Sequence, residues 1–254
     1  MNFVVFDDSD VCADGLIRLG GERAKHVCEV LHASTGDTIR LAHVGGALHP
    51  GSTIRAVSAG GGEVLVAPGT ASPPPARSPV DLALALPRPK CLRRLWPQIA
   101  AFGPRRVFVT AAEKVEKSYW GCTFLKPEIR EGLMREGLAQ AGDSTVPRVS
   151  IVRRLKPFLE DEVPALYPPG SRFFAHPGDS GAGLAALLAA TRARTAPALV
   201  AVGPEGGWSP FEIDMFTRCG FRAVSLGPRI LRTDTAVVAL LGIAETGNSS
   251  VRED

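Results

Sequence analysis

Short apolar runs alternate with helical patterns through most of the chain. Six of these runs predict strands, over Val80–Leu86, Arg106–Ala111, Arg148–Val152, Arg172–His176, Leu199–Val202 and Arg222–Leu226. Apolar residues at helical spacing predict helices over Lys90–Phe102, Lys126–Ala141, Pro157–Leu166, Gly183–Ala193, Pro210–Cys219 and Thr233–Thr246. Strands that alternate with helices favour an α/β domain with a largely parallel sheet.

The first 70 residues have a different pattern. Their apolar or alternating runs are short, at Asn2–Phe6, Thr38–Ala42, Thr53–Val57 and Glu63–Val66, with glycine turns between them. One short helix is predicted over Gly21–Leu31. Closely spaced strands of this kind predict a small β-barrel.

A proline-rich stretch separates the two patterns. Residues 68–79 read PGTASPPPARSP, and proline continues neither a helix interior nor a sheet ladder. The sequence therefore predicts a barrel domain over 1–72, a linker over 73–79 and an α/β domain over 80–254.

Composition narrows the class of protein. Hydrophobic residues make up 45% and charged residues 22% of the chain, as in ordinary soluble domains. No apolar run approaches the length of a membrane span, and the acidic start, MNFVVFDDSD, does not resemble a secretory signal. The five cysteines form no CxxC pair, and the histidines lack metal-ligand spacing with them. We expect a cytoplasmic protein without a membrane segment or a metal site.

Positive charge is concentrated in one region, although the net charge is only +3. No acidic residue occurs between Asp81 and Glu113, where six basic residues fall. Such a patch suits a polyanion such as RNA, and a solvated helix face beside a basic loop is the equally simple alternative. The residues expected to contact RNA are Arg88, Lys90, Arg93, Arg94, Lys114 and Lys117.

Two glycine-containing turns follow the last two predicted strands. The first is Gly203-Pro204-Glu205-Gly206-Gly207, and the second is Gly227-Pro228-Arg229. Neither is a dinucleotide fingerprint or a phosphate loop, because the G-x-G-x-x-G register and a G-K-[ST] sequence are missing. Between them, Ser209 and Glu212 predict a capping box for a helix that begins at Pro210. This arrangement predicts a ligand crevice at the strand ends.

The segments GPEGGWSPFEIDMF and SLGPRILRTDTA resemble the carboxyl-terminal signature of the RsmE family, SPOUT-superfamily methyltransferases that modify N3 of a uridine in 16S ribosomal RNA. The resemblance implies a PUA-like barrel followed by an α/β domain with a carboxyl-terminal trefoil knot. It also implies S-adenosylmethionine as cofactor, the small ribosomal subunit as substrate and a homodimer formed through the knotted domain. The cofactor-binding residues that it implies are His176, Pro177, Val202, Gly203, Pro204, Glu205, Gly206, Gly207, Leu226, Gly227, Arg229, Ile230, Leu231 and Thr233.

The chemistry of uracil N3 suggests two catalytic residues. This nitrogen carries a proton and is a poor nucleophile, so the site needs a base or a cation that stabilises charge on the ring carbonyls. Arg232 is the candidate for the electrostatic role, and Glu205 for the base or substrate anchor. The structural alternatives are an ion pair of Arg232 with Asp234 or Glu205, and capping by Glu205 of the helix that starts at Ser209.

Other segments depart from the family pattern. Many members carry E-A-x-E-Q-S-x-R, where this chain keeps Gln140 but has Asp143 in place of the arginine. Tyr119 and Trp120 are neighbours in the sequence, and such a lone aromatic pair fits core or dimer packing better than base stacking. Two alternatives therefore stay open: a SPOUT methyltransferase acting on another RNA site such as a ribose 2′-hydroxyl, or a non-catalytic RNA-binding assembly factor.

Overall fold

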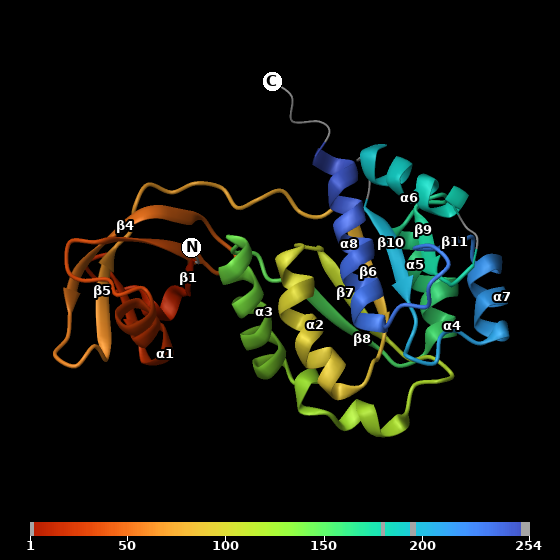
Figure 1. Ribbon diagram of the computed structural model, residues 1–254, viewed down its shortest axis with the longest axis horizontal. Coiled ribbons are helices and arrows are strands. Elements are labelled where there is room, and N and C mark those ends of the chain that lie inside the picture. The colour runs from red at the N-terminus through yellow and green to blue at the C-terminus, as the bar shows by residue number, and fades with distance from the viewer. Residues whose placement is uncertain (1–2, 179–180, 194–196, 250–254) are drawn as a thin grey trace. The chain divides into compact units, whose positions relative to one another are not determined.

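The structure is a computed structural model that describes residues 3–178, 181–193 and 197–249. The chain forms two compact units, one of residues 1–76 with 135–146 and one of residues 77–134 with 147–254. Figure 1 shows the ribbon of both units.

The first unit contains a five-stranded sheet that curls into a nearly closed barrel. Its strands are β1 (Val4–Phe6), β2 (Ile17–Gly20), β3 (Thr38–His43), β4 (Leu48–Val57) and β5 (Glu63–Ala67), in the order β1-β3-β4-β5-β2. Strand β1 runs parallel to β3, and the other pairs are antiparallel. Apolar side chains of all five strands meet in one core with Ala24 and Val27. Strand β2 is absent from the sequence prediction, because its four residues, IRLG, end at the glycines that begin the next helix.

The helix predicted over Gly21–Leu31 changes from α-helical to π-helical hydrogen bonding halfway along its length. It begins as α1 (Gly21–Lys25) and continues as one wider π-type turn over His26–Val30. The buried residues Ala24 and Val27 fix this segment on the barrel core.

Residues 135–146 belong to the first unit, although the sequence placed them in the α/β domain. They comprise the last turns of α3 (Pro127–Ala141) and the loop that follows. The amide of Phe3 donates to the carbonyl of Ala139 over 2.9 Å, and the amide of Gly45 donates to that of Ser144 over 2.8 Å. Such long-range hydrogen bonds leave no local signal in the sequence, which explains the difference.

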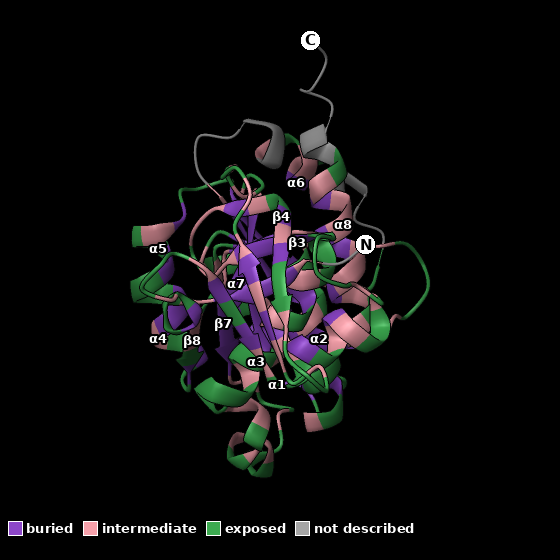
Figure 2. Cartoon of the chain, turned by 90° about the vertical axis from the view of Figure 1, so that its left-hand side faces the viewer, coloured by how far each residue is buried: buried purple, intermediate pink, exposed green. Residues whose placement is uncertain are grey.

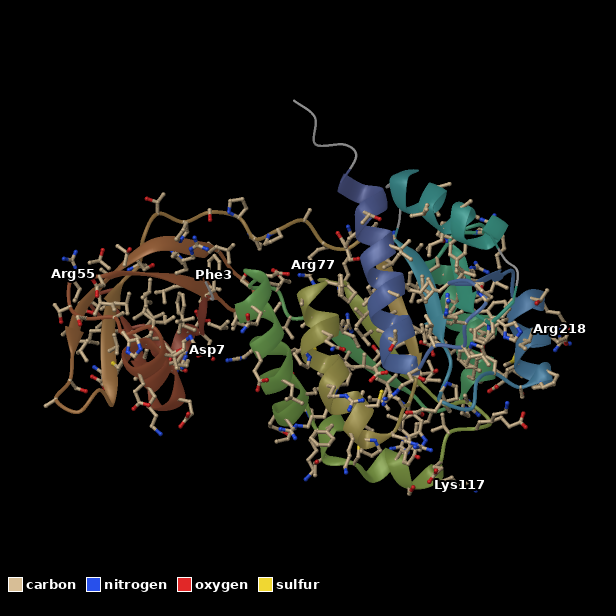
Figure 3. The ribbon with its side chains drawn as sticks, viewed as in Figure 1. Phe3, Asp7, Arg55, Arg77, Lys117 and Arg218 are labelled. Carbon is tan, nitrogen blue, oxygen red and sulfur yellow. The ribbon has the colours of Figure 1, made fainter. Side chains whose placement is uncertain are left out.

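Asp7 adds a charged contact within the same unit. Its carboxylate accepts from the Ser9 hydroxyl over 2.6 Å and from Arg135 Nη1 over 2.9 Å. These two hydrogen bonds lower the pKa of Asp7 to about 2. Figure 3 labels Asp7 among the side chains of this unit.

We expect Ser9→Ala to raise the pKa of Asp7 from about 2 toward its ordinary value, because the Ser9 hydroxyl is the largest cause of the shift. The ionised carboxylate contributes stability above about pH 4, and this contribution is lost as the pH falls toward 2. In the variant the loss therefore begins at higher pH. A carbon-detected NMR titration of Asp7 measures the pKa, and unfolding between pH 2 and about 6 measures the stability.

A matched control is Ser34→Ala, an exposed serine whose backbone amide, rather than its hydroxyl, binds Asp37. This variant should leave the Asp7 titration unchanged. An Asp7 pKa that stays near 2 in Ser9→Ala would contradict the assignment of its cause.

The second unit is built on a six-stranded sheet whose neighbouring strands are all parallel. The strands are β6 (Val80–Ala85), β7 (Arg106–Thr110), β8 (Arg148–Val152), β9 (Arg172–Ala175), β10 (Ala198–Val202) and β11 (Arg222–Val224). Their order is β11-β9-β10-β6-β7-β8. The α/β class and the parallel sheet predicted from the sequence are confirmed.

Helices cover both faces of this sheet (Figure 1). On one face α2 (Pro89–Ala101) and α6 (Gly181–Ala193) both pack against α8 (Thr233–Ser249). On the other face α7 (Pro210–Arg218), α4 (Leu155–Pro157) and α5 (Val163–Leu166) share a core with the strands. Burial on both faces explains why central strands such as β6 and β10 are buried along their whole length. Figure 2 shows the buried residues gathered on strands such as β7.

Buried polar groups close the amino-terminal edge of the sheet. Asp81 accepts from the Tyr167 hydroxyl over 2.7 Å and from the amide of Arg106 over 2.8 Å. Burial raises the pKa of Asp81 above its usual range. The buried guanidinium of Arg172 donates to the carbonyl oxygens of Tyr167 and Cys219, which end two helical segments. This edge is occupied by structural hydrogen bonds.

Candidate functional site

Three loops meet at the carboxyl-terminal edge of the second unit's sheet. Because β9, β10 and β11 are neighbouring parallel strands, the segments that follow them leave the sheet at the same edge. They enclose a pocket of about 570 Å³. Every residue that the sequence analysis expected to hold a cofactor lines this pocket, and so does Arg232. The lining residues that the sequence analysis did not name are Ala175, Trp208, Val224, Ser225 and Ala236.

The turn after β10 is held in one conformation. The amide of Gly207 donates to the carbonyl of Pro204 over 2.8 Å, and Gly207 has a φ of +67°, which glycine adopts without strain. Lys114 Nζ donates to the carbonyl of Gly206 over 2.8 Å. A Cβ atom added to Gly203 would approach the Trp208 indole to 3.2 Å. Backbone hydrogen bonds and close packing thus shape this wall of the pocket before any ligand arrives.

The turn after β11 is organised around Ser225 and Gly227. The Ser225 hydroxyl accepts from the amide of Gly227 over 3.2 Å and lies 3.1 Å from the Gly227 carbonyl, to which it donates. Gly227 has a φ of +103°, a value that side chains of L-residues rarely allow. The Thr233 hydroxyl donates to the carbonyl of Gly203 over 3.4 Å and joins this segment to the other turn. The two turns therefore form one wall.

The helix between the turns has the predicted capping box. Glu212 Oε2 accepts from the amide of Ser209 over 2.8 Å, and the Ser209 hydroxyl accepts from the amide of Glu212 over 3.4 Å. Glu212 Oε1 also accepts from the amide of Glu113 over 2.8 Å. Glu212 consequently fixes both the start of α7 and the loop after β7.

Glu205 lies in the pocket wall and contacts α2. Its Oε1 accepts from the backbone amide of Arg88, the residue before α2, over 3.0 Å. The alternative in which Glu205 caps the helix at Ser209 is wrong, because Glu212 fills that position. The hydrogen bond from Arg88 therefore fixes the orientation of the Glu205 carboxylate in the pocket wall.

Arg232 reaches the pocket from the last residue before α8. Its side chain is 76% exposed, and its Nε lies 3.7 Å from Asp234 Oδ1. Asp234 Oδ2 in turn accepts from Arg94 Nη2 of α2 over 2.7 Å. Partial burial opposes ionisation of Asp234, but the hydrogen bonds from Arg94 and from the amide of Thr235 lower its pKa. The structural alternative for Arg232, an ion pair with Asp234, is therefore present, and it leaves most of the guanidinium accessible.

Cys91 lies behind this charged group and takes no part in acid–base chemistry near neutral pH. Burial raises the pKa of the Cys91 thiol to about 11, and the carboxylates of Asp234 and Glu205 contribute to the shift. The thiol is therefore protonated and unreactive under ordinary conditions. All five cysteines are free thiols.

The residues expected to contact RNA are all exposed: Arg88, Lys90, Arg93, Arg94, Lys114 and Lys117. They differ in what else they bind. Arg94 is paired with Asp234, and Lys114 holds the carbonyl of Gly206, so both side chains also stabilise the pocket. Figure 3 labels Lys117 in the segment that follows β7.

Sequence reasoning missed two side chains at this edge. Asp234 was considered only as a structural partner of Arg232, and its bond to Arg94 joins residues 140 positions apart. Trp208 follows directly after the glycine turn and is 5% exposed. Within the described residues its buried indole nitrogen has no hydrogen-bond partner. Trp208 could have been predicted as a pocket residue, because it directly follows the glycine turn in the sequence.

Two other classes of site find no support in the part of the chain that the structure describes. No group of three or more histidine, cysteine, aspartate or glutamate residues there is arranged to hold a metal ion. No helix in residues 3–178, 181–193 or 197–249 combines the length and the apolar character of a membrane span.

Comparison with known proteins gives a family match over most of the chain. The family model described as "RNA methyltransferase domain" matches residues 74–245. The ribosomal RNA small subunit methyltransferase E of Treponema pallidum is 26% identical, over 96% of this chain and 90% of its own length. The protein of the same name from Buchnera aphidicola is 52% identical over 40 residues, which is 16% of each chain.

Solved structures share the fold over the full length. The crystal structure of a ribosomal RNA small subunit methyltransferase E from Neisseria gonorrhoeae bound to S-adenosyl methionine has a TM-score of 0.70 and 19% identity. The similarity covers 96% of this chain and 97% of that one. A putative methyltransferase from Legionella pneumophila, in complex with the same cofactor, has a TM-score of 0.66 and 20% identity over 97% and 98% of the two chains.

Proposed function

This chain belongs to the RNA methyltransferase family, and from that premise we propose that it transfers a methyl group from S-adenosylmethionine to N3 of a specific uridine in 16S ribosomal RNA. The observation that carries the proposal is the pocket at the carboxyl-terminal edge of the second unit's sheet. Its walls are the loops after β9, β10 and β11, and the cationic side chain of Arg232 lines it.

The residues present fit the cofactor. The pocket of about 570 Å³ lies within the roughly 300–1,000 Å³ range of small-molecule sites. Apolar side chains of Leu226, Ile230 and Leu231 line it together with glycine backbone, which suits an adenine ring between apolar surfaces and main-chain hydrogen-bonding groups. When bound, S-adenosylmethionine supplies an electrophilic methyl group.

The protein's own part in the reaction is to position the uracil and to stabilise its negative charge. Loss of the N3 proton spreads charge onto the two ring carbonyls, where the Arg232 guanidinium supplies a compensating positive charge. Glu205, oriented by the amide of Arg88, takes the proton or anchors the base. The pair of Arg94 and Asp234 holds Arg232 beside the pocket.

The carboxyl-terminal part of the second unit supports a trefoil knot. Strand β11 lies at the edge of the sheet beside β9, yet the chain after it returns past the turn that follows β10. It then forms α8, which packs against α2 and α6. We propose that this path forms the carboxyl-terminal trefoil knot that the family resemblance implies, a rare arrangement of the chain.

A homodimer is the proposed working form. Ile230, in the pocket loop, is 85% exposed, and Phe211 on α7 is 61% exposed. A second copy that covers these side chains would complete the site from outside. The proposed place of action is the cytoplasm, on the assembled or nearly assembled small subunit, and the proposed role of the PUA-like barrel is to bind RNA.

Deletion of the gene tests the function in the cell. A methyl group on N3 occupies the Watson–Crick edge of the uracil, so it stops reverse transcriptase at that nucleotide. We expect one stop in 16S ribosomal RNA to disappear on deletion and to return when the gene is restored. An unchanged pattern of stops would contradict the proposal, and a lost ribose 2′-O-methyl group would favour the other RNA site.

A further inference from the structure

A tryptophan and an arginine form a stacked pair outside the pocket. The guanidinium of Arg153 lies over the ring of Trp120, with Cζ 4.7 Å from the ring centre. Trp120 belongs to the 3-10 turn Lys117–Gly121 after β7, and Arg153 follows directly after β8. Arg153 is exposed and Trp120 is half-buried.

The pair lies at the same edge of the sheet as the pocket. Strand β8 pairs in parallel with β7, β7 with β6, and β6 with β10, so the segments after all of them leave at one edge. Two hydrogen bonds connect the segment that leads to Trp120 with the elements around the pocket. The Glu113 amide donates to Glu212 of α7, and Lys114 donates to the carbonyl of Gly206 in the glycine turn.

Trp120 differs from the other two tryptophans of the chain. Trp96 is fully buried and donates from its indole nitrogen to the carbonyl of Phe124, and Trp208 is 5% exposed in the pocket wall. Both are packing residues. Trp120 is not part of the core cluster described for its unit, and its ring contacts the solvent-exposed guanidinium of Arg153.

Exposed basic side chains lie in both segments of the pair: Arg153, Arg154 and Lys156 follow β8, and Lys114 and Lys117 precede Trp120. Exposed acidic side chains occur in the same segments, at Glu113, Glu116, Glu160, Asp161 and Glu162. Two of them are engaged locally: Glu116 accepts from the Tyr119 hydroxyl over 2.8 Å, and Glu160 lies 3.9 Å from Lys156. Cations interleaved with an aromatic ring are suited to a nucleic acid strand.

We propose that Trp120 and Arg153 form a platform on which a base of the RNA strand flanking the modified uridine stacks. This inference rests on the proposed function, because it takes its ligand to be single-stranded RNA. A planar guanidinium on an aromatic ring offers a base both stacking and attraction, and it accepts any base because each has a π face. The positive charges on either side would contact the phosphates.

Binding of a 12-nucleotide oligouridine, followed by fluorescence anisotropy without cofactor, tests the platform. Trp120→Ala should weaken binding about tenfold, and Trp120→Phe should keep most of the affinity. Arg153→Met should weaken binding several-fold and reduce the slope of log affinity against log salt by about 1.

The matched control is Arg222→Met. Arg222 lies over the Phe173 ring, with Cζ 5.2 Å from its centre, at the start of β11 and therefore at the opposite edge. The variant removes the same charge from a similar pair, and we expect no change in RNA affinity. Thermal unfolding of each variant checks that it is folded.

Photocrosslinking locates the base directly. The same oligonucleotide carrying 5-iodouridine should crosslink to Trp120, as mapped by mass spectrometry of tryptic peptides. Absence of that crosslink, or equal RNA affinity of wild type and Trp120→Ala, would overturn the proposal. Dissociation of a dimer in Trp120→Ala and Trp120→Phe, with monomers that bind RNA normally, would instead assign Trp120 to subunit packing.

Methyl transfer and RNA affinity, measured on the same variant, distinguish a wrong platform from a wrong function. If ribosomal RNA is methylated at N3 and the KM for RNA is the same in Trp120→Ala, the platform is wrong and the function stands. If no methyl transfer occurs but Trp120→Ala lowers RNA affinity, the platform stands without the reaction.

Discussion

Arg232→Ala should lower the rate of methyl transfer by about 10²–10³-fold while the affinity for S-adenosylmethionine changes little. The reason is that the Arg232 side chain is 76% exposed beside the pocket and is anchored only at one end, on Asp234. We therefore propose that this side chain stabilises the negative charge that develops on the uracil. Single-turnover transfer measures the rate, and calorimetry with the cofactor measures the affinity.

Two neighbouring variants sharpen that prediction. Arg229→Ala removes the other arginine of the same pocket loop and should act mainly on cofactor affinity. Asp234→Asn keeps the size of the anchor and removes its charge, so it should lower the rate by less than Arg232→Ala does. An Arg232→Ala protein that loses cofactor binding in proportion to its rate would show that the electrostatic role is wrongly assigned.

Gly227→Val should weaken cofactor binding by about 10–100-fold, because the turn after β11 depends on a backbone conformation that valine disfavours. Gly227 has a φ of +103° and lines the pocket, and both hydrogen bonds of Ser225 depend on this conformation. A turn that is folded correctly only part of the time lowers the apparent affinity by that fraction. Calorimetry with S-adenosylmethionine provides the measurement.

Gly36→Val is the matched control for that change. Gly36 has a φ of +96°, and a Cβ added there would meet no atom within 4 Å, as at Gly227, but it lies in the first unit. The strain is similar, so the first unit should lose stability while cofactor affinity stays the same. Equal cofactor affinity in Gly227→Val and wild type would contradict the assignment of this turn to the cofactor site.

The class of the second unit was predictable because its strands and helices carry strong local patterns. A strand buried on both faces has a nearly continuous apolar run, as β6 and β10 do. Strand β10 ends at the glycine turn, and β6 is followed by Pro87 and Pro89. The start of α7 was predictable for the same reason, since Ser209, Pro210 and Glu212 are each favoured at their positions.

Features that depend on distant contacts were not predictable. The order of the strands, with β10 between β9 and β6, has no local signal. The same is true of the bond from Arg94 to Asp234 and of the residues 135–146 that belong to the first unit. Strand β2 was missed because its four residues run directly into the glycines that begin the next helix.

The candidate site was partly predictable from the turns alone. Glycine at Gly203, Gly206 and Gly207 indicated close backbone approach or positive φ at a strand end; of these three, Gly207 has a positive φ, and Gly203 lies close to the Trp208 indole. The sequence pattern did not predict which contacts hold the glycine turn after β10 in its conformation. Lys114 on Gly206 and the amide of Arg88 on Glu205 come from elements far away in the sequence.

Methyl transfer by the purified protein tests directly whether it methylates N3 of a uridine in 16S ribosomal RNA. Small ribosomal subunits from the deletion strain are incubated with the protein and S-adenosylmethionine carrying a ¹⁴C-labelled methyl group, and the 16S ribosomal RNA is digested to nucleosides and separated. We expect label in 3-methyluridine alone, close to one methyl group per subunit, and labelling that is about 10²–10³-fold slower with Arg232→Ala. Label in any other nucleoside, or no label with a protein that binds the cofactor, would contradict the proposed function.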